Sequence, residues 1–236
     1  MALLEVRNLS KRFGGLWALK NVDLDVIDGE VLGIIGPNGA GKTTLFNCIS
    51  GYYKPDSGKV IFQSRDITGL PPFKIAQLGI ARTFQQTKAF NNLTVLDNLR
   101  IAALYRGTSL DEVLEIIKLV GLEGRRNSLA SNLTILERKR LELARALVIK
   151  PKLLLLDEVM AGLKPHEADE LLDVILRINK SGVTIVIVEH VMRTIKKVCN
   201  RVVVLDFGVK IAEGRPEEVM RDEKVIKAYL GEEFAA

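Results

Sequence analysis

The sequence has few cysteines and no long hydrophobic run. Its two cysteines, Cys48 and Cys199, lie far apart and outside any metal-binding or CxxC spacing, so we expect reduced thiols, without a disulfide framework. Apolar runs such as Leu153 to Leu156 are far shorter than the roughly 20 residues of a membrane-spanning helix. The beginning, MALLEVRNLSKRF, shows no small-residue cleavage site of a signal peptide. Together these absences predict a cytoplasmic location.

Internal repeats, low-complexity tracts and Gly/Ser linkers are also missing, so we expect residues 1–236 to form a single domain. A hydrophobic content of 47% predicts a substantial core. The net charge of +5 would suit a nucleic acid or an anionic membrane surface. However, Lys and Arg alternate with Asp and Glu along most of the chain. We interpret these charges as solvated helix faces and expect no nucleic-acid partner.

Hydrophobic periodicity predicts an α/β chain. LLEVRNLSKRF and ALKNVDLDVIDGE alternate apolar and polar residues and predict antiparallel strands. Helices then dominate from about residue 67 to 132 (FKIAQLGIA, VLDNLRIAALYRG and LDEVLEIIKLVGL), with a helical subdomain at about 86–150. Strands and helices alternate again from LLLLD to RVVVLD, a pattern typical of βαβ units. A short strand, VKIAEG, and a helix, EEVMRDEKVIKAYL, are expected last.

A glycine-rich stretch lies between a predicted strand, VLGIIG, and a predicted helix. Its residues GPNGAGKT match the phosphate-loop pattern GxxxxGK[ST] in full. Glycines let successive backbone N–H groups point inward, and the helix N-terminus adds positive charge. Lys42 is expected to reach the β- and γ-phosphates and Thr43 to coordinate Mg²⁺. A turn without a ligand would not need this combination, so the sequence predicts a nucleoside triphosphate site formed by Gly36, Asn38, Gly39, Ala40, Gly41, Lys42, Thr43 and Thr44.

Two carboxylates, Asp157 and Glu158, follow the apolar run LLLL at the predicted end of a strand. Ligands bind at this edge of a parallel sheet. We expect Asp157 to hold Mg²⁺ through water and Glu158 to polarise the attacking water. His190, one of two histidines, follows the strand TIVIV and is expected to contact the γ-phosphate or the water. Each would have an ordinary structural explanation alone, but their combination with the phosphate loop favours function.

These motifs resemble the ATP-binding subunit of ABC transporters over essentially the whole chain. The resemblance implies an α/β P-loop NTPase core with a parallel sheet, an N-terminal antiparallel β subdomain and a helical insertion. It also implies ATP and Mg²⁺ as cofactors and hydrolysis of ATP coupled to transport. By resemblance, Phe13 stacks on adenine, and Gln85 in ARTFQQ serves catalysis and binds the metal. Glu158 is then the catalytic glutamate and His190 the switch histidine.

Several stretches are similar to a narrower group, the ATPase subunits of branched-chain amino acid importers. They are ARTFQ with NNLTVLDNL, DEVMAGLKPHE, VIVEHVM and AYLGEEF. This resemblance implies a heterodimer with a sister ATPase, two membrane subunits and an external solute-binding protein. It implies a position at the cytoplasmic face of the cell membrane. The membrane subunits would contact a groove beside Gln85, with Lys88, Phe90 and Leu93 as candidates.

The signature sequence of the family, LSGGQ, is replaced here by Leu133-Thr134-Ile135-Leu136-Glu137. Val159 and Lys164 also replace the usual proline after the catalytic glutamate and the Asp or Asn of the D-loop. Thr134 and Glu137 form a capping box and are the predicted contacts to a nucleotide held by the partner. Leu136 is expected to obstruct the approach of a phosphate, and Glu137 to add a negative charge beside it. We therefore expect a sound helix with weakened signature contacts.

This altered signature predicts an unequal pair of sites and leaves alternatives open. The chain's own phosphate loop would serve a competent site if the partner contributes a good signature. A DNA-repair ATPase would need a coiled-coil insertion for which the chain has no room, and a translation protein would carry two cassettes. A transporter for another solute, or a regulatory subunit with impaired hydrolysis, remains an alternative. The transported solute itself is not encoded in these motifs.

Overall fold

The computed structural model describes residues 2–83 and 89–230, and the chain divides into two compact units. The first unit contains the described residues of 1–78 and 184–236, and the second contains those of 79–183. No helix among the described residues has the length and apolar character that a membrane crossing requires.

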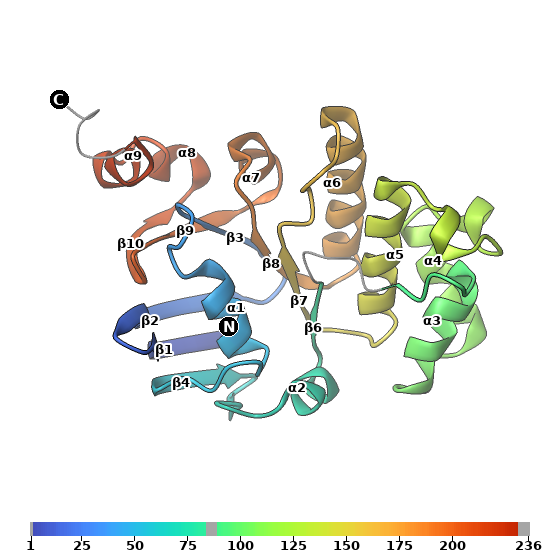
Figure 1. Ribbon diagram of the computed structural model, residues 1–236, viewed down its shortest axis with the longest axis horizontal. Coiled ribbons are helices and arrows are strands. Elements are labelled where there is room, and N and C mark those ends of the chain that lie inside the picture. Colours follow the sequence, from blue (N-terminus) through green and yellow to red (C-terminus); the bar gives the residue numbers. More distant parts are fainter. Residues whose placement is uncertain (1, 84–88, 231–236) are drawn as a thin grey trace. The chain divides into compact units, whose positions relative to one another are not determined.

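The first unit begins with an antiparallel sheet of strand order β2-β1-β4-β5. The first two strands form a hairpin in which Leu4 lies opposite Val26, and both side chains are fully buried. Figure 1 shows β1, β2 and β4 side by side in blue and cyan. The alternation of apolar and polar residues predicted β1 and β2, because one face of each strand packs on the core. Their bounds are β1 (Ala2–Phe13), β2 (Leu16–Ile27), β4 (Ser57–Phe62) and β5 (Arg65–Asp66).

The second sheet of this unit has the order β10-β9-β3-β8. Strand β3 (Val31–Ile35) lies at its centre and pairs in parallel with both β8 (Thr184–Val188) and β9 (Arg201–Asp206). All five residues of β3 and of β8 are buried, and such strands have continuous apolar sequences. Strand β10 (Val209–Gly214) pairs antiparallel with β9. The helices of the unit are α1 (Lys42–Ile49), α2 (Pro72–Leu78), α7 (Met192–Val198), α8 (Pro216–Val219) and α9 (Glu223–Leu230).

The second unit combines two parallel strands with a group of helices. Strand β6 (Ile80–Arg82) pairs in parallel with β7 (Leu153–Asp157), which is buried throughout. The green helices α3 and α4 and the yellow helix α5 of Figure 1 pack on one another, and α6 packs on α4 and α5. Their bounds are α3 (Val95–Leu104), α4 (Leu110–Leu119), α5 (Ile135–Leu147) and α6 (Pro165–Lys180), with short 3₁₀ turns at η1 (Glu123–Arg125) and η2 (Ala130–Asn132).

Two local predictions were wrong. The helix predicted over FKIAQLGIA ends at Leu78, because Gly79 takes a φ of +104° and the next three residues form β6. The final predicted helix is divided into α8 and α9 by a turn after Val219. The strands β4 and β5 lie in a stretch for which the sequence analysis predicted no element, and β4 pairs with β1 to cover its second edge.

Candidate nucleotide site

The glycine-rich loop connects buried β3 to α1, and two of its glycines are required by close backbone contacts. Gly36 has a φ of +148°, and a Cβ atom there would lie 2.0 Å from the carbonyl oxygen of Leu205. Gly41, at the N-cap of α1, has a φ of +101°, and its Cβ would lie 2.4 Å from the carbonyl oxygen of Ala18. Any side chain would force the backbone apart at both positions. The loop therefore depends on these glycines for its conformation.

Lys42 is held inside this loop. Its Nζ donates hydrogen bonds to the carbonyl oxygens of Gly36 at 2.6 Å and Pro37 at 2.8 Å, and the residue is 5% exposed. The loop carbonyls thus compensate a buried ammonium group before any anion arrives. The remaining predicted phosphate contacts lie around it: Asn38, Gly39 and Thr43 are exposed, Thr44 is half-buried, and Ala40 is buried.

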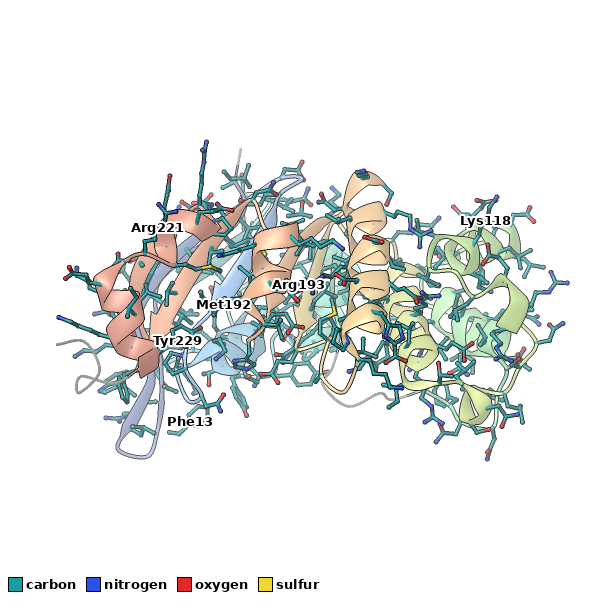
Figure 2. The ribbon with its side chains drawn as sticks, turned by 90° about the horizontal axis from the view of Figure 1, so that it is seen from above. Phe13, Lys118, Met192, Arg193, Arg221 and Tyr229 are labelled. Atoms are coloured by element: carbon teal, nitrogen blue, oxygen red, sulfur yellow. The ribbon has the colours of Figure 1, made fainter. Side chains whose placement is uncertain are left out.

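The C-terminal helix contacts the first glycine of the loop. Tyr229 belongs to α9 (Figure 2), and its hydroxyl has a hydrogen bond with the backbone of Gly36. Burial raises the pKa of the Tyr229 phenol, and the hydrogen bond from Gly36 partly opposes this shift. The segment that follows β10 therefore supports the phosphate loop.

Phe13 ends β1 and presents an aromatic ring to solvent, as Figure 2 shows in the first unit. The residue is 44% exposed, and its ring meets that of Tyr53 edge to face at a centroid distance of 5.1 Å. The ammonium group of Lys11 lies 5.4 Å from the Phe13 centroid. An exposed ring fixed from one side suits stacking with a flat base.

In the second unit, Asp157 occupies the end of β7 and is paired with Arg82 of β6. The Arg82 Nη2 atom lies 2.8 Å from Asp157 Oδ2, and each side chain is only 7% exposed. The backbone N–H of Asp157 donates a hydrogen bond to the Thr83 hydroxyl at 3.4 Å. The carboxylate is thus held by the neighbouring strand.

Glu158 directly follows β7 and has a φ of +48°, which is uncommon for a residue with a side chain. This left-handed conformation ends the regular pleat of β7 after Asp157. Such a conformation costs on the order of 1 to 2 kcal/mol and persists only where the surroundings impose it.

His190 lies in the first unit, two residues beyond the end of β8, and is exposed. The preceding residue, Glu189, is 3% exposed. Two predicted residues, Gln85 and Lys88, lie outside the described residues.

The altered signature forms the N-terminus of α5 in the second unit. The Thr134 hydroxyl accepts a hydrogen bond from the N–H of Glu137 at 3.2 Å, and Glu137 Oε2 accepts one from the N–H of Thr134 at 2.9 Å. These two bonds are the capping box, so this prediction is confirmed. Leu136, which was predicted to obstruct a phosphate, is 8% exposed, whereas the neighbouring Ile135 is 56% exposed. The exposed branched side chain is therefore that of Ile135.

The charge of Glu137 is also compensated. Arg125 Nε donates to Glu137 Oε1 at 2.8 Å, while the other carboxylate oxygen makes the capping bond. Burial alone would raise the pKa of Glu137, but the hydrogen bonds from Thr134 and Arg125 outweigh it and lower that pKa. The sequence reasoning treated this carboxylate as an isolated negative charge, whereas the structure shows half of an ion pair.

Sequence reasoning therefore missed three residues at these sites, of which two belong to stretches that were selected for another reason. Arg82 belongs to ARTFQQ, which was selected for its glutamine, and Tyr229 belongs to AYLGEEF. Arg125 precedes another arginine in a short loop and carried no signal by itself.

The loop between β3 and α1, with its buried lysine, and the acidic end of β7 define a phosphate-loop nucleotide-binding protein. The family model described as ABC transporter matches residues 19–161, and that described as branched-chain amino acid ATP-binding cassette transporter matches residues 209–235. The chain belongs to the ATP-binding subunits of the ABC transporter family. It therefore binds ATP and hydrolyses it for transport, as the resemblance implied.

Individual relatives agree with this assignment. The high-affinity branched-chain amino acid transport ATP-binding protein LivG of Salmonella typhimurium is 40% identical over 98% of both chains. The lipopolysaccharide export system ATP-binding protein LptB of Escherichia coli is 37% identical over 99% of both chains. The crystal structure of the ATP-binding cassette MJ1267 in its ADP conformation is 34% identical, with a TM-score of 0.91, and the match covers 98% of this chain and all of that one. The predicted fold class is therefore confirmed.

Proposed function

We propose that this chain is the ATP-hydrolysing subunit of an importer for branched-chain or other hydrophobic amino acids. The match of residues 209–235 to a branched-chain amino acid cassette family carries this proposal. The similarity to LivG along nearly the whole chain supports it. The cassette supplies the energy for transport, and the solute is selected elsewhere in the assembly.

The phosphate loop binds the triphosphate of ATP in this proposal. Backbone N–H groups of the loop and the N-terminus of α1 face the phosphate oxygens. Lys42 exchanges the carbonyl oxygens of Gly36 and Pro37 for the β- and γ-phosphates, a short displacement because its ammonium group already lies within the loop. Adenine stacks on the exposed ring of Phe13.

The residues proposed to bind the metal fit Mg²⁺. The Thr43 hydroxyl and the Asp157 carboxylate offer the hard oxygen ligands that this ion prefers, and Gln85 is a third candidate. Bound Mg²⁺ would offset negative charge on the phosphates. Glu158 orients and polarises the attacking water, and His190 contacts the γ-phosphate or that water.

The proposed assembly is a heterodimer with a sister ATPase at the cytoplasmic face of the cell membrane. When it is isolated, the chain can instead form a homodimer. Two membrane subunits and an external solute-binding protein complete it. Each ATP lies between the phosphate loop of one ATPase and the signature of the other. Thr134 and Glu137 therefore serve the partner's nucleotide, and the glycine-free signature makes the two sites unequal.

We assign the contact with the membrane subunits to an apolar groove on α3 and α4. The groove has a volume of about 700 Å³ and includes Leu93, a predicted contact, together with Leu104, which is 84% exposed. Phe90, the other described candidate, is 46% exposed, and its ring centroid lies 5.2 Å from the Arg145 guanidinium. An exposed apolar groove of this kind fits an apolar helix of a partner.

The central experiment is Glu158→Gln in the assembled complex. It should lower steady-state ATP hydrolysis at least a hundredfold, or about 2.7 kcal/mol of transition-state stabilisation, while ATP still binds. Glu115→Gln, an exposed change on α4, is the matched control and should have no effect. A loss of no more than a few-fold from Glu158→Gln would contradict the catalytic assignment. Co-purification of the partners, followed by a ligand screen on the solute-binding protein, identifies the solute.

Two alternatives each have an observation in their favour. The similarity to LptB favours a cassette for another solute, and the same ligand screen tests it. The signature without glycines favours a regulatory subunit that binds ATP without turning it over. Single-turnover hydrolysis with the sister subunit present distinguishes these roles, because a regulatory subunit would retain its ATP.

A further inference from the structure

The ion pair between Arg82 and Asp157 occupies the carboxylate proposed to bind Mg²⁺. The guanidinium bonds Oδ2 at 2.8 Å, and both side chains are 7% exposed. Charges this well shielded from water are weakly screened, and removing one partner of a buried pair commonly destabilises a protein strongly. Asp157 therefore has a counter-ion of its own before any metal reaches it.

The backbone positions the arginine for this contact. Arg82 is the last residue of β6 and lies opposite Leu155 in the parallel pairing, two residues before Asp157. The following residue, Thr83, donates its N–H to the Leu155 carbonyl at 3.0 Å, and its hydroxyl accepts a hydrogen bond from the Asp157 N–H. The last residue of β6 thus holds the carboxylate of Asp157, and the residue after it holds the backbone of β7.

We propose that Arg82 is a positioning residue that makes Asp157 accept a divalent cation only together with a triphosphate. This inference rests on the proposed role of Asp157 as a metal-binding residue. A doubly charged cation arriving alone would meet a carboxylate already neutralised and a guanidinium that repels it. The negative charge of a triphosphate offsets this repulsion, so the metal enters with the nucleotide. Arg82 thereby protects the site from occupation by metal alone.

The test measures Mn²⁺ binding to the full chain by electron paramagnetic resonance, with and without ATP. Without ATP, Arg82→Met should bind Mn²⁺ at least tenfold more tightly than the unmodified chain, because the repelling charge is gone and a buried carboxylate needs a counter-ion. Arg82→Lys keeps the charge and should bind Mn²⁺ as weakly as the unmodified chain. Adding Asp157→Asn to Arg82→Met should abolish the gain. Equal Mn²⁺ affinity in Arg82→Met and the unmodified chain would overturn the inference.

Thermal unfolding separates this role from a merely structural one. Arg82→Met should lower the Tm, and Mn²⁺ without nucleotide should restore part of the loss because the cation replaces the guanidinium. The double variant Arg82→Met with Asp157→Asn lacks both charges and should show no response to Mn²⁺. A loss of Tm in Arg82→Met that Mn²⁺ leaves unchanged would make Arg82 purely structural and refute the proposal.

The single variant Asp157→Asn tests the underlying function separately. It should weaken binding of Mn·ATP in an otherwise unmodified chain. Unchanged Mn·ATP binding would contradict the proposed metal role of Asp157 itself. A clear loss in Asp157→Asn, combined with no gain in Arg82→Met, would refute only the role assigned to Arg82.

Discussion

The pair between Arg125 and Glu137 gives a sharp prediction about the altered signature. Arg125→Ala leaves the Glu137 carboxylate in the capping box but removes its counter-charge. In the proposed dimer, that carboxylate then faces the phosphates of the partner's ATP without compensation. We expect Arg125→Ala to weaken ATP-dependent assembly with the sister subunit. Glu137→Gln, added to Arg125→Ala, should restore it, because glutamine also caps the helix and carries no charge.

The exposed fractions of the two side chains set how much this ion pair contributes to stability. The Arg125 side chain is 51% exposed and that of Glu137 is 18% exposed, so the pair contributes about 0.2 to 1 kcal/mol to folding. The corresponding fall in Tm is about 1 to 4 °C for a chain of this length. An uncompensated charge near several phosphate charges costs more, about 1 to 2 kcal/mol at a water-exposed site. Assembly should therefore weaken about five- to thirtyfold.

The assay is sedimentation of the two ATPase subunits at a series of ATP concentrations, with Glu158→Gln in this chain to prevent turnover. Arg126→Ala is the matched control, since Arg126 is the exposed neighbour and the structure records no side-chain ion pair for it among the described residues. Salt should reduce the difference between Arg125→Ala and the unmodified chain. The reasoning is refuted if the double variant assembles no better than Arg125→Ala.

Three further predictions concern the stability of the chain. Thr134→Val removes the hydroxyl that caps α5 and should lower the free energy of unfolding by about 1 kcal/mol in urea titrations; an unchanged midpoint would contradict the cap. Gly36→Ala places a Cβ atom against Leu205 and should cost about 1 to 3 kcal/mol in the same assay, with loss of ATP binding by calorimetry; full stability would contradict the crowding. Burial raises the pKa of Glu213, but contacts with Lys210 and Arg201 outweigh it and lower that pKa. The ionised Glu213 carboxylate therefore stabilises the fold above the ordinary carboxyl pKa, and this stabilisation is lost as pH falls through the lowered pKa. Glu213→Gln should then flatten the acid side of a curve of unfolding free energy against pH. An unaltered acid side would refute this linkage.

The parts of the molecule that could be predicted are those whose residue pattern lies within a short stretch of sequence. The phosphate loop needs eight adjacent residues, and continuous burial of β3 and β8 leaves an apolar run for each. The capping box of α5 depends on two residues three positions apart. The side-chain direction of Leu136 was also within reach: Leu136, Leu143 and Leu147 share the helical spacing of a core face, and all three are buried. The comparison of residues 133–137 with the LSGGQ signature drew attention away from this periodicity.

The remainder depends on contacts between distant residues. Arg82 and Asp157 are 75 residues apart in sequence, and nothing in either neighbourhood encodes their pairing. The strand β4 was missed because its pairing with β1, not its own composition, makes it a strand. The end of α2 at Leu78 likewise reflects pairing of the next residues with β7, which overrides the apolar pattern of FKIAQLGIA.

The hydrogen bond between Tyr229 and Gly36 means that α9 should be kept when the protein is shortened for study. Shortening the chain before Tyr229 would deprive a phosphate-loop amide of its acceptor, so nucleotide affinity measured on a trimmed protein would describe a different loop. The same amide offers a reporter, because its hydrogen exchange should slow when α9 is docked and quicken when α9 detaches. Helix α9 is therefore coupled to the backbone of the phosphate loop.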